Sequence, residues 1–358
     1  MGTADNAQSK DDMKGHPALA TILCCFFSIV ESSCTRQDSQ AGTTTGRRVL
    51  AIADLNWQQI ADLDRQKTLF LLTVGMLEEH GPHLPIASDT IGVEHEARSV
   101  ADSLRQALPD WQVVLMPTVN YGSSGANQIG NVTIHPGTYG LRQSTLRSLV
   151  ADIGAQIAQN GFKWVFVLNG HGAPTHHLAV NDACDFVSDV FDATMLNVSA
   201  LFTADPTIQA EGEAIAAKHF SAADVESFGR DQHAGVGETS GVLFIRPDLV
   251  DPGYRSLPSH RVGNRTEMIE VASRPEWPGY FSSPAKANAA YGREVEGWWI
   301  RGISNLILEA VRGENLRSRP RWPEQAETDS AYRQILEYTR APERAFDLQF
   351  QRWLDQHK

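Results

Sequence analysis

The sequence predicts an α/β fold. Short apolar runs of strand length alternate with longer segments in which apolar residues recur at helical spacing. The strand candidates are residues 68–74, 113–117, 164–168 and 195–201, and the helical patterns cover residues 55–60, 89–108, 141–160, 211–225, 287–311 and 332–357. Polar, glycine-bearing loops directly follow several of the strand candidates. Such loops carry the chemistry of α/β sheets, because they lie at the carboxyl ends of the strands.

Length and composition bound the organisation of the chain. It has 358 residues, of which 42% are hydrophobic, and no internal linker or repeat divides its middle. We therefore expect one large domain over residues 49–315, followed by a polar, proline-bearing stretch and a C-terminal helical extension over residues 316–358. We find no recognisable chemistry in this extension. A formal net charge of −12 with no basic stripe argues against a nucleic-acid partner.

The beginning of the chain has the features of an export signal. Residues 18–30 form an apolar run of thirteen residues, which is too short to span a bilayer and fits a signal-peptide core. Only Lys14 is charged between Met13 and this run, so Met13 is a candidate start. The Ser-Ser-Cys sequence that ends at Cys34 resembles the cleavage region of a bacterial lipoprotein signal, except that Glu31 stands where an aliphatic residue is usual.

We therefore expect residues 1–34 to be a signal peptide and residues 35–48, which are polar and aperiodic, to be a flexible tether. The mature protein is expected in the periplasm or outside the cell, and lipidation of Cys34 is its one expected link to a membrane. Cys184 is then the only mature cysteine, so no internal disulfide can form. Its helical, apolar surroundings predict a core position.

The first polar loop follows the strand candidate 68–74, which stops at Gly75. In an extended loop Glu78 and His80, two residues apart, point the same way, and Asp89 follows at the start of a helical pattern. Two carboxylates and an imidazole suit a borderline divalent ion such as zinc, manganese or iron. The alternative is that Glu78 is solvated, His80 is an ordinary loop residue and Asp89 caps the helix; this segment alone does not decide between the two.

Two further polar loops carry candidate site residues. His171 lies in an Asn-Gly-His-Gly loop after the strand candidate 164–168, a position topologically equivalent to that of Glu78 and His80. His176 and His177 begin the next helix and are expected to be bystanders. His233 and Glu238 are five residues apart with two glycines between them, although an ordinary surface loop would also explain that stretch. A third glycine-rich loop, residues 120–125, lacks the Gly-Lys-Ser/Thr signature of a phosphate site.

These motifs in combination resemble the creatininase family of amidohydrolases. Residues 78–85 (Glu-Glu-His-Gly-Pro-His-Leu-Pro) with Asp89 resemble the family signature Glu-x-His-Gly-x-His-Leu-Pro. Residues 169–172 resemble its Asn-Gly-His-Gly, residues 233–240 are similar to its His-Ala-Gly-x-x-Glu-Thr-Ser, and Pro136-Gly137-Thr138 also matches. Order and spacing agree over roughly residues 50–311.

The resemblance implies a three-layer α/β/α domain around a mostly parallel sheet, and hydrolysis of a C–N bond at a two-metal site. Carried over by motif, Glu78 and His171 bind one metal, His80 binds the other and Asp89 bridges both. His233 donates a proton to the leaving nitrogen. The expected ions are zinc first, with manganese or iron as alternatives. The resemblance also implies a homo-oligomer, which in many members is a hexamer.

Two departures from creatininase itself put creatinine in doubt as the substrate. A metal-binding glutamate two residues after the Asn-Gly-His histidine is Ala173 here, and a Glu-His pair common in the family is replaced by Ala126-Asn127. We predict that Glu238 replaces the missing ligand and takes part in catalysis, because the glycines before it let its loop approach closely. The alternative is that Glu238 caps the next element or orients a ligand.

The expected function is metal-dependent hydrolysis of a small cyclic or linear amide by a metal-activated water. Two alternatives stay open. One is a member of the same family that trims short peptides, and the other is a binding protein that keeps the fold without catalysis. The retention of four ligand-type residues argues against the second alternative.

Overall fold

The computed structural model describes residues 49–132, 135–324 and 328–358. The described residues belong to one compact unit. The predicted signal peptide, the lipidation site at Cys34 and the tether lie outside the described residues. Across the three described ranges, no helix is long and apolar enough to cross a membrane.

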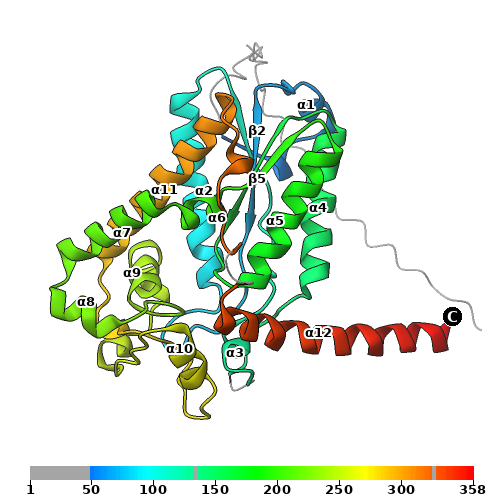
Figure 1. Cartoon of the computed structure of the whole chain (residues 1–358). Helices are drawn as coiled ribbons and strands as arrows, with labels where there is room; N and C mark the ends of the chain where they lie inside the picture. The colour runs from blue at the N-terminus through cyan, green and yellow to red at the C-terminus, as the bar shows by residue number, and fades with distance from the viewer. Residues whose placement is uncertain (1–48, 133–134, 325–327) are drawn as a thin grey trace, which may run out of the picture. The chain divides into compact units, whose positions relative to one another are not determined.

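Five strands form one parallel sheet at the centre of this unit (Figure 1). They are β1 (Val49–Ala51), β2 (Thr68–Val74), β3 (Gln112–Leu115), β4 (Trp164–Asn169) and β5 (Thr194–Asn197), in the order β1-β3-β2-β4-β5. Every strand pairing is parallel. The parallel α/β fold predicted from the sequence is thus confirmed. Val74 pairs with Asn169 at the end of the β2–β4 ladder, so the loops after these central strands begin side by side.

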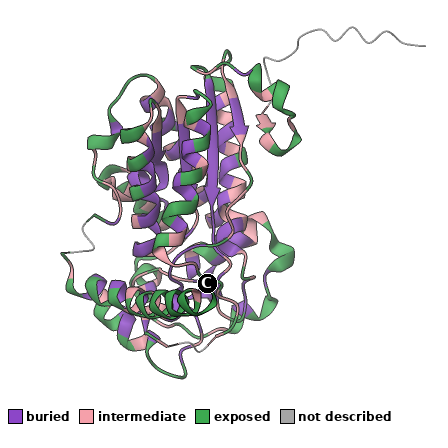
Figure 2. Ribbon diagram, turned by 90° about the vertical axis from the view of Figure 1, so that its right-hand side faces the viewer, coloured by how far each residue is buried: buried purple, intermediate pink, exposed green. Residues whose placement is uncertain are grey.

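Two helical layers cover the sheet. Helices α2 (Ser88–Ala107) and α11 (Ala289–Val311) pack on one face, and α4 (Gln143–Gln159) and α5 (Pro174–Val190) pack on the other. Every residue of β2 is buried, and successive side chains enter opposite cores as a strand requires: Leu69 and Leu71 join the first, and Phe70 and Leu72 join the second. Figure 2 shows the buried residues concentrated on the strands and inner helix faces.

The remaining elements are shorter helices and turns, and the C-terminal helix. The helices are α1 (Trp57–Ala61), α3 (Ala126–Ile129), α6 (Val198–Ala204), α7 (Pro206–His219), α8 (Ala222–Phe228), α9 (Val236–Ile245), α10 (Arg265–Ala272) and α12 (Ser330–His357). Among them, α3, α10 and α12 lie at the end of the sheet opposite to α1 (Figure 1). Short 3-10 turns occur at Ile52–Asp54, Pro247–Leu249, Pro252–Ser256, Pro284–Lys286 and Leu316–Ser318.

Two predicted elements differ in the structure. The strand predicted over residues 195–201 ends at Asn197, and the rest is helix α6, because the Asn197 side chain accepts a hydrogen bond from the Ala200 amide and caps the helix. The single helix predicted over residues 211–225 is two helices, α7 and α8. A capping box at Ser221, formed with Asp224, starts the second one.

Two other expectations concern the core. Cys184 is 1% exposed and free, as its apolar surroundings predicted. The C-terminal helical pattern, expected to be a peripheral extension, forms α12. Its first half is part of the core, because Tyr332 and Ile335 pack in a hydrophobic cluster with residues of α10 and with Trp277. The second half of α12 is largely exposed.

Glu96 on α2 and Glu296 on α11 are buried carboxyl groups on helices that pack together. Burial raises the pKa of both, that of Glu296 to about 7, and charge repulsion from Glu296 raises the pKa of Glu96 further. A raised folded-state pKa gives stability that is complete below the ordinary value of 4.5 and is lost as the pH rises through about 7.

We therefore expect Glu296→Gln to raise the Tm at pH 8 by about 2–4 °C, which corresponds to about 1 kcal/mol. At pH 5 the variant and the parent should unfold at similar temperatures. Thermal unfolding followed by circular dichroism at both pH values measures this, with the exposed Glu314→Gln as a control. An equal shift at pH 5 and pH 8 would contradict the ionisation argument.

Candidate active site

The three polar loops identified in the sequence meet at the carboxyl end of the sheet. The loop after β2 carries Glu78 and His80, and the loop after β4 carries His171. Asp89, in the first turn of α2, reaches the same point because Gly170 has no side chain. A Cβ at Gly170 would lie only 2.4 Å from the Asp89 carbonyl oxygen. The glycine in the Asn-Gly-His-Gly motif therefore allows the helix to approach the loop that carries His171.

Glu78, Asp89 and His171 form one group of ligand-type side chains. Nδ1 of His171 lies 3.0 Å from Oε2 of Glu78 and 3.0 Å from Oδ2 of Asp89. All three residues are buried. Their ligand atoms lie within 4.8 Å of one another, which is close enough to hold a metal ion.

His80, Asp89 and Glu238 form a second such group. Nε2 of His80 lies 3.2 Å from Oδ1 of Asp89 and 3.5 Å from Oε2 of Glu238. The two oxygens of Asp89 thus face different histidines. Glu238 reaches the site from the first turn of helix α9 and not from a glycine-loosened loop, so the predicted route was wrong. Its Oε2 also accepts a hydrogen bond of 2.5 Å from the Ala234 amide, as the capping alternative expected.

Backbone carbonyls fix the orientation of both histidines. Nε2 of His171 lies 2.6 Å from the Ser124 carbonyl oxygen, and Nδ1 of His80 lies 3.0 Å from that of Glu78. A carbonyl accepts only, so these nitrogens are the ones that donate an N–H. The opposite nitrogen of each ring then faces the carboxylates with a lone pair when the ring is neutral. Metal-binding histidines in proteins are held in this way.

The donor set fits divalent cations. Glu78 Oε2, His80 Nε2 and Asp89 Oδ2 are buried and have no hydrogen-bond partner among the described residues. Burial disfavours a charged imidazole, but Asp89, Glu238 and Glu78 together raise the pKa of His80 to about 10. Without a metal ion, protonated histidines would have to balance the negative charge of the three carboxylates Glu78, Asp89 and Glu238. Bound metal cations can balance the same charge. Carboxylate oxygens and imidazole nitrogens are common ligands of zinc and manganese.

His233 lies beside these groups and contacts two carboxylates. Its Nε2 is 3.6 Å from Oε1 of Glu79, its Nδ1 is 3.8 Å from Oε1 of Glu78, and its ring centroid is 4.3 Å from that of His80. Burial opposes the charged form of His233, but Glu78 and Glu79 raise its pKa. This environment favours a protonated imidazole that can give up a proton.

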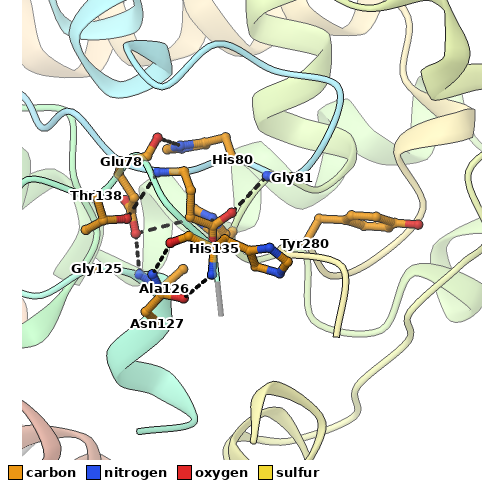
Figure 3. A network of polar contacts seen from close by, with 12 residues as sticks. Glu78, His80, Gly81, Gly125, Ala126, Asn127, His135, Thr138 and Tyr280 are labelled. Atoms are coloured by element: carbon orange, nitrogen blue, oxygen red, sulfur yellow. Dashed lines mark hydrogen bonds and ion pairs between the residues drawn. The ribbon is translucent and has the colours of Figure 1, made fainter. Parts of the chain in front are cut away.

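The sequence singled out several residues behind the site but did not predict their roles. Figure 3 shows the Ala126 amide, at the start of α3, donating to Oε1 of Glu78, and Asn127 contacting the His135 backbone. The Ala126-Asn127 pair that departs from the family therefore supports the site through its backbone and an amide side chain. The Thr138 hydroxyl accepts from the Glu79 amide, so the Pro-Gly-Thr motif also braces this loop.

The other histidines have structural contacts. The ring of His176 packs against that of His171 with centroids 5.1 Å apart, and its Nδ1 accepts from the Ser123 amide. His177 contacts Asn169 and Asn197. Neither belongs to a ligand group found in the described part of the chain. Both were expected to be bystanders, yet they pack directly behind the candidate ligand His171.

Comparison with known proteins supplies the family. The family model of creatininase, described as creatinine amidohydrolase, matches residues 53–307. The chain belongs to the creatininase family. The family predicted from the loop motifs is therefore confirmed, and with it the general class of hydrolase.

Two characterised relatives differ in their named activities. A "Mycofactocin precursor peptide peptidase" from Mycobacterium ulcerans is 30% identical over 263 residues, which cover 70% of this chain and 88% of that protein. A "Creatinine amidohydrolase" from Pseudomonas putida is 25% identical over 278 residues, which cover 72% and 96%.

Solved creatininase structures share the fold. The structures described as "Creatininase Mn" and as a mutant creatininase of "Zn-Zn type" align with TM-scores of 0.54 and 0.53 at 23% identity. Each alignment covers 74% of this chain and 99% of the solved one. The structural neighbours of this creatininase-family chain thus include one described with manganese and one described with zinc.

Proposed function

We propose that this protein is a two-metal amidohydrolase that hydrolyses a C–N bond in a small cyclic or linear amide. The observation that supports this most is the position of Asp89, whose two carboxylate oxygens face His171 and His80. A carboxylate shared by two ligand groups is what a bridging ligand requires. Zinc is the first candidate ion and manganese or iron the alternatives, because the groups combine oxygen and nitrogen donors.

In the proposed assignment Glu78 and His171 would hold one ion, His80 and Glu238 would hold the second, and Asp89 would serve both. Two such ions lower the pKa of a water molecule and polarise the carbonyl under attack. His233 is the proposed proton donor to the leaving nitrogen, which otherwise departs as a poor anion. Glu79, 3.6 Å from His233, orients that imidazole and favours its charged form.

Peptide trimming is a second candidate function, and a specific observation favours it. The relative named as a mycofactocin precursor peptide peptidase is 30% identical to this chain, whereas the named creatinine amidohydrolase is 25% identical. The replacement of a creatininase ligand by Ala173 also argues against creatinine itself. Both candidates use the same attack on an amide carbonyl, so they differ in what surrounds the reacting bond.

A substrate panel with controlled metal content tests the proposal. The purified chain is stripped with a chelator, reloaded with zinc or manganese, and assayed against cyclic ureides, formamides, lactams and short peptides. We expect hydrolysis of one class, lost on chelation and restored by the metal. Cleavage of peptides alone would select the second candidate. Full activity in the stripped protein would contradict metal dependence.

Glu238→Gln should lower the metal content from about two ions per chain, the number that two-metal catalysis uses, towards one. The amide keeps the size of the side chain but removes the negative charge near His80, from which Glu238 Oε2 lies 3.5 Å. Elemental analysis of the protein after dialysis measures this. Glu213→Gln, on the exposed surface of α7, is the matched control. An unchanged stoichiometry would mean that Glu238 is not a ligand.

A further inference from the structure

We propose that helix α12 positions His171 through Ser124, so that a segment outside the family match orients a candidate metal ligand. The family match ends at residue 307, and α12 begins at Ser330. The inference rests on the proposed role of His171 as a ligand. It gives the C-terminal segment a task in the site, where the sequence suggested none.

A hydrogen bond to the backbone of Ser124 orients His171. The Ser124 carbonyl oxygen accepts from Nε2–H of His171 at 2.6 Å, which leaves Nδ1 directed at Glu78 and Asp89. Displacement of this carbonyl would let the imidazole turn about its side-chain torsions. Its Nδ1 lone pair would then no longer point between the two carboxylates. The position of the Ser124 backbone is therefore part of the geometry of the first ligand group.

Ser124 adopts a backbone conformation that contacts with neighbouring residues must hold in place. Its φ is +64°, in the left-handed region that non-glycine residues seldom occupy. It lies in the loop before α3, where no strand pairing holds it. A residue in this region persists when its surroundings fix it. The contacts that fix Ser124 therefore also fix the acceptor of His171.

Helix α12 supplies a contact that holds Ser124 in place. The Thr339 hydroxyl on α12 donates to Oγ of Ser124 at 2.9 Å. A threonine hydroxyl has one hydrogen, and the Ile335 carbonyl is a longer alternative acceptor at 3.3 Å. Thr339 and Ser124 are 4% and 6% exposed, so water does not readily replace the bond. One turn further along α12, Glu343 accepts from the Gln143 amide at 2.8 Å and ties the helix to the start of α4.

The part of α12 that carries Thr339 is itself packed against the rest of the protein. Its residues Tyr332, Ile335 and Thr339 lie on the buried face, and the first two pack in the cluster with α10. Figure 1 shows α12 passing close to α3 before its second half projects away. The helix can therefore transmit its position to the Ser124 loop.

The test measures zinc affinity and stability separately. Zinc binding is titrated against a chelating dye, with zinc alone as the probe, in full-length Thr339→Val, Thr339→Ser and Ser124→Ala. We expect Thr339→Val and Ser124→Ala to weaken zinc binding about threefold to tenfold, less than the tenfold to hundredfold typical when a direct partner of a ligand is removed. Thr339→Ser keeps the hydroxyl and should stay within twofold of the parent.

Two further variants separate positioning from general destabilisation. Thr68→Val removes a buried hydroxyl at the opposite end of β2, so it should leave zinc affinity unchanged whatever it does to the Tm of the metal-free protein. The double variant Thr339→Val/Ser124→Ala should lose little more than either single variant, because both remove the same bond. If Thr339→Val does not fold, Ser124→Ala decides, since it leaves α12 intact.

The outcomes distinguish this inference from the proposed function. If the parent binds zinc and both Thr339→Val and Ser124→Ala bind it with the parental affinity, the role of α12 is overturned but the proposed function is not. Equal losses in these variants and in Thr68→Val would overturn it as well, because the effect would then be general. A parent that binds no zinc or manganese at all would overturn the proposed function and this inference together.

Discussion

Asp89→Asn is expected to reduce kcat/KM by at least about a thousandfold, or about 4 kcal/mol in activation free energy. The variant keeps the size of the side chain but removes the carboxylate whose two oxygens lie 3.2 Å from Nε2 of His80 and 3.0 Å from Nδ1 of His171. Each proposed metal loses an anionic ligand, so both the activation of water and the polarisation of the carbonyl are impaired.

The fold should tolerate this change. Asp89 lies in the first turn of α2, where an asparagine is also well tolerated. The substitution changes no apolar side chain of the core. Steady-state kinetics, elemental analysis and thermal unfolding of the metal-free protein measure the three effects. Asp102→Asn, on the exposed side of the same helix, is the control. Parental metal content with parental activity in Asp89→Asn would refute the shared-ligand assignment.

His233→Gln is expected to lower kcat by about 10²–10⁴-fold, the usual contribution of a positioned proton donor. His233 forms a third possible ligand group with Glu78 and His80, but the proposed assignment uses His233 as a proton donor and not as a ligand. The metal content should therefore stay that of the parent. A glutamine cannot deliver a proton from a charged ring, so the leaving nitrogen departs unassisted.

The leaving group offers a sharper test of the same assignment. An anilide with an electron-withdrawing ring leaves more readily without protonation, so the defect of His233→Gln should shrink on this substrate. His95→Gln, in which the lost ring packs on Phe244, is the control for losing a histidine. An equal defect on the amide and on the activated anilide would argue that His233 binds or orients the substrate instead.

The parts of this protein that local pattern determines were predictable. The strand Thr68–Val74 has the predicted bounds, because an uninterrupted apolar run that stops at a glycine leaves little alternative. The Asn-Gly-His-Gly loop was placed at the end of β4 for the same reason. Glu78, His80 and His171 come together because adjacent parallel strands end at the same edge, which is a property of the sheet.

The features that depend on contacts between distant parts of the sequence were not predicted. Glu238 was placed on a loop because the glycines before it suggested one, but Asp231 accepts from the Val236 and Gly237 amides and thereby starts α9 there. Ser124 has no sequence signal, since its role depends on a backbone carbonyl and on Thr339, 215 residues away. Such contacts are decided by tertiary packing and leave no local pattern.

The ladder between β2 and β4 has a consequence for how this chain can change. Six consecutive residue pairs, from Leu69–Trp164 to Val74–Asn169, lock the two strands in register. The spacing between the starts of the two ligand-bearing loops is thus set by the backbone of two strands that are buried except at Trp164. Insertions or deletions in segments away from this ladder, such as those around α8 and α10, are therefore expected to leave the spacing of the two loops unchanged. Segments that contact a substrate can then differ between proteins of this fold while the positions of Glu78, His80 and His171 stay the same.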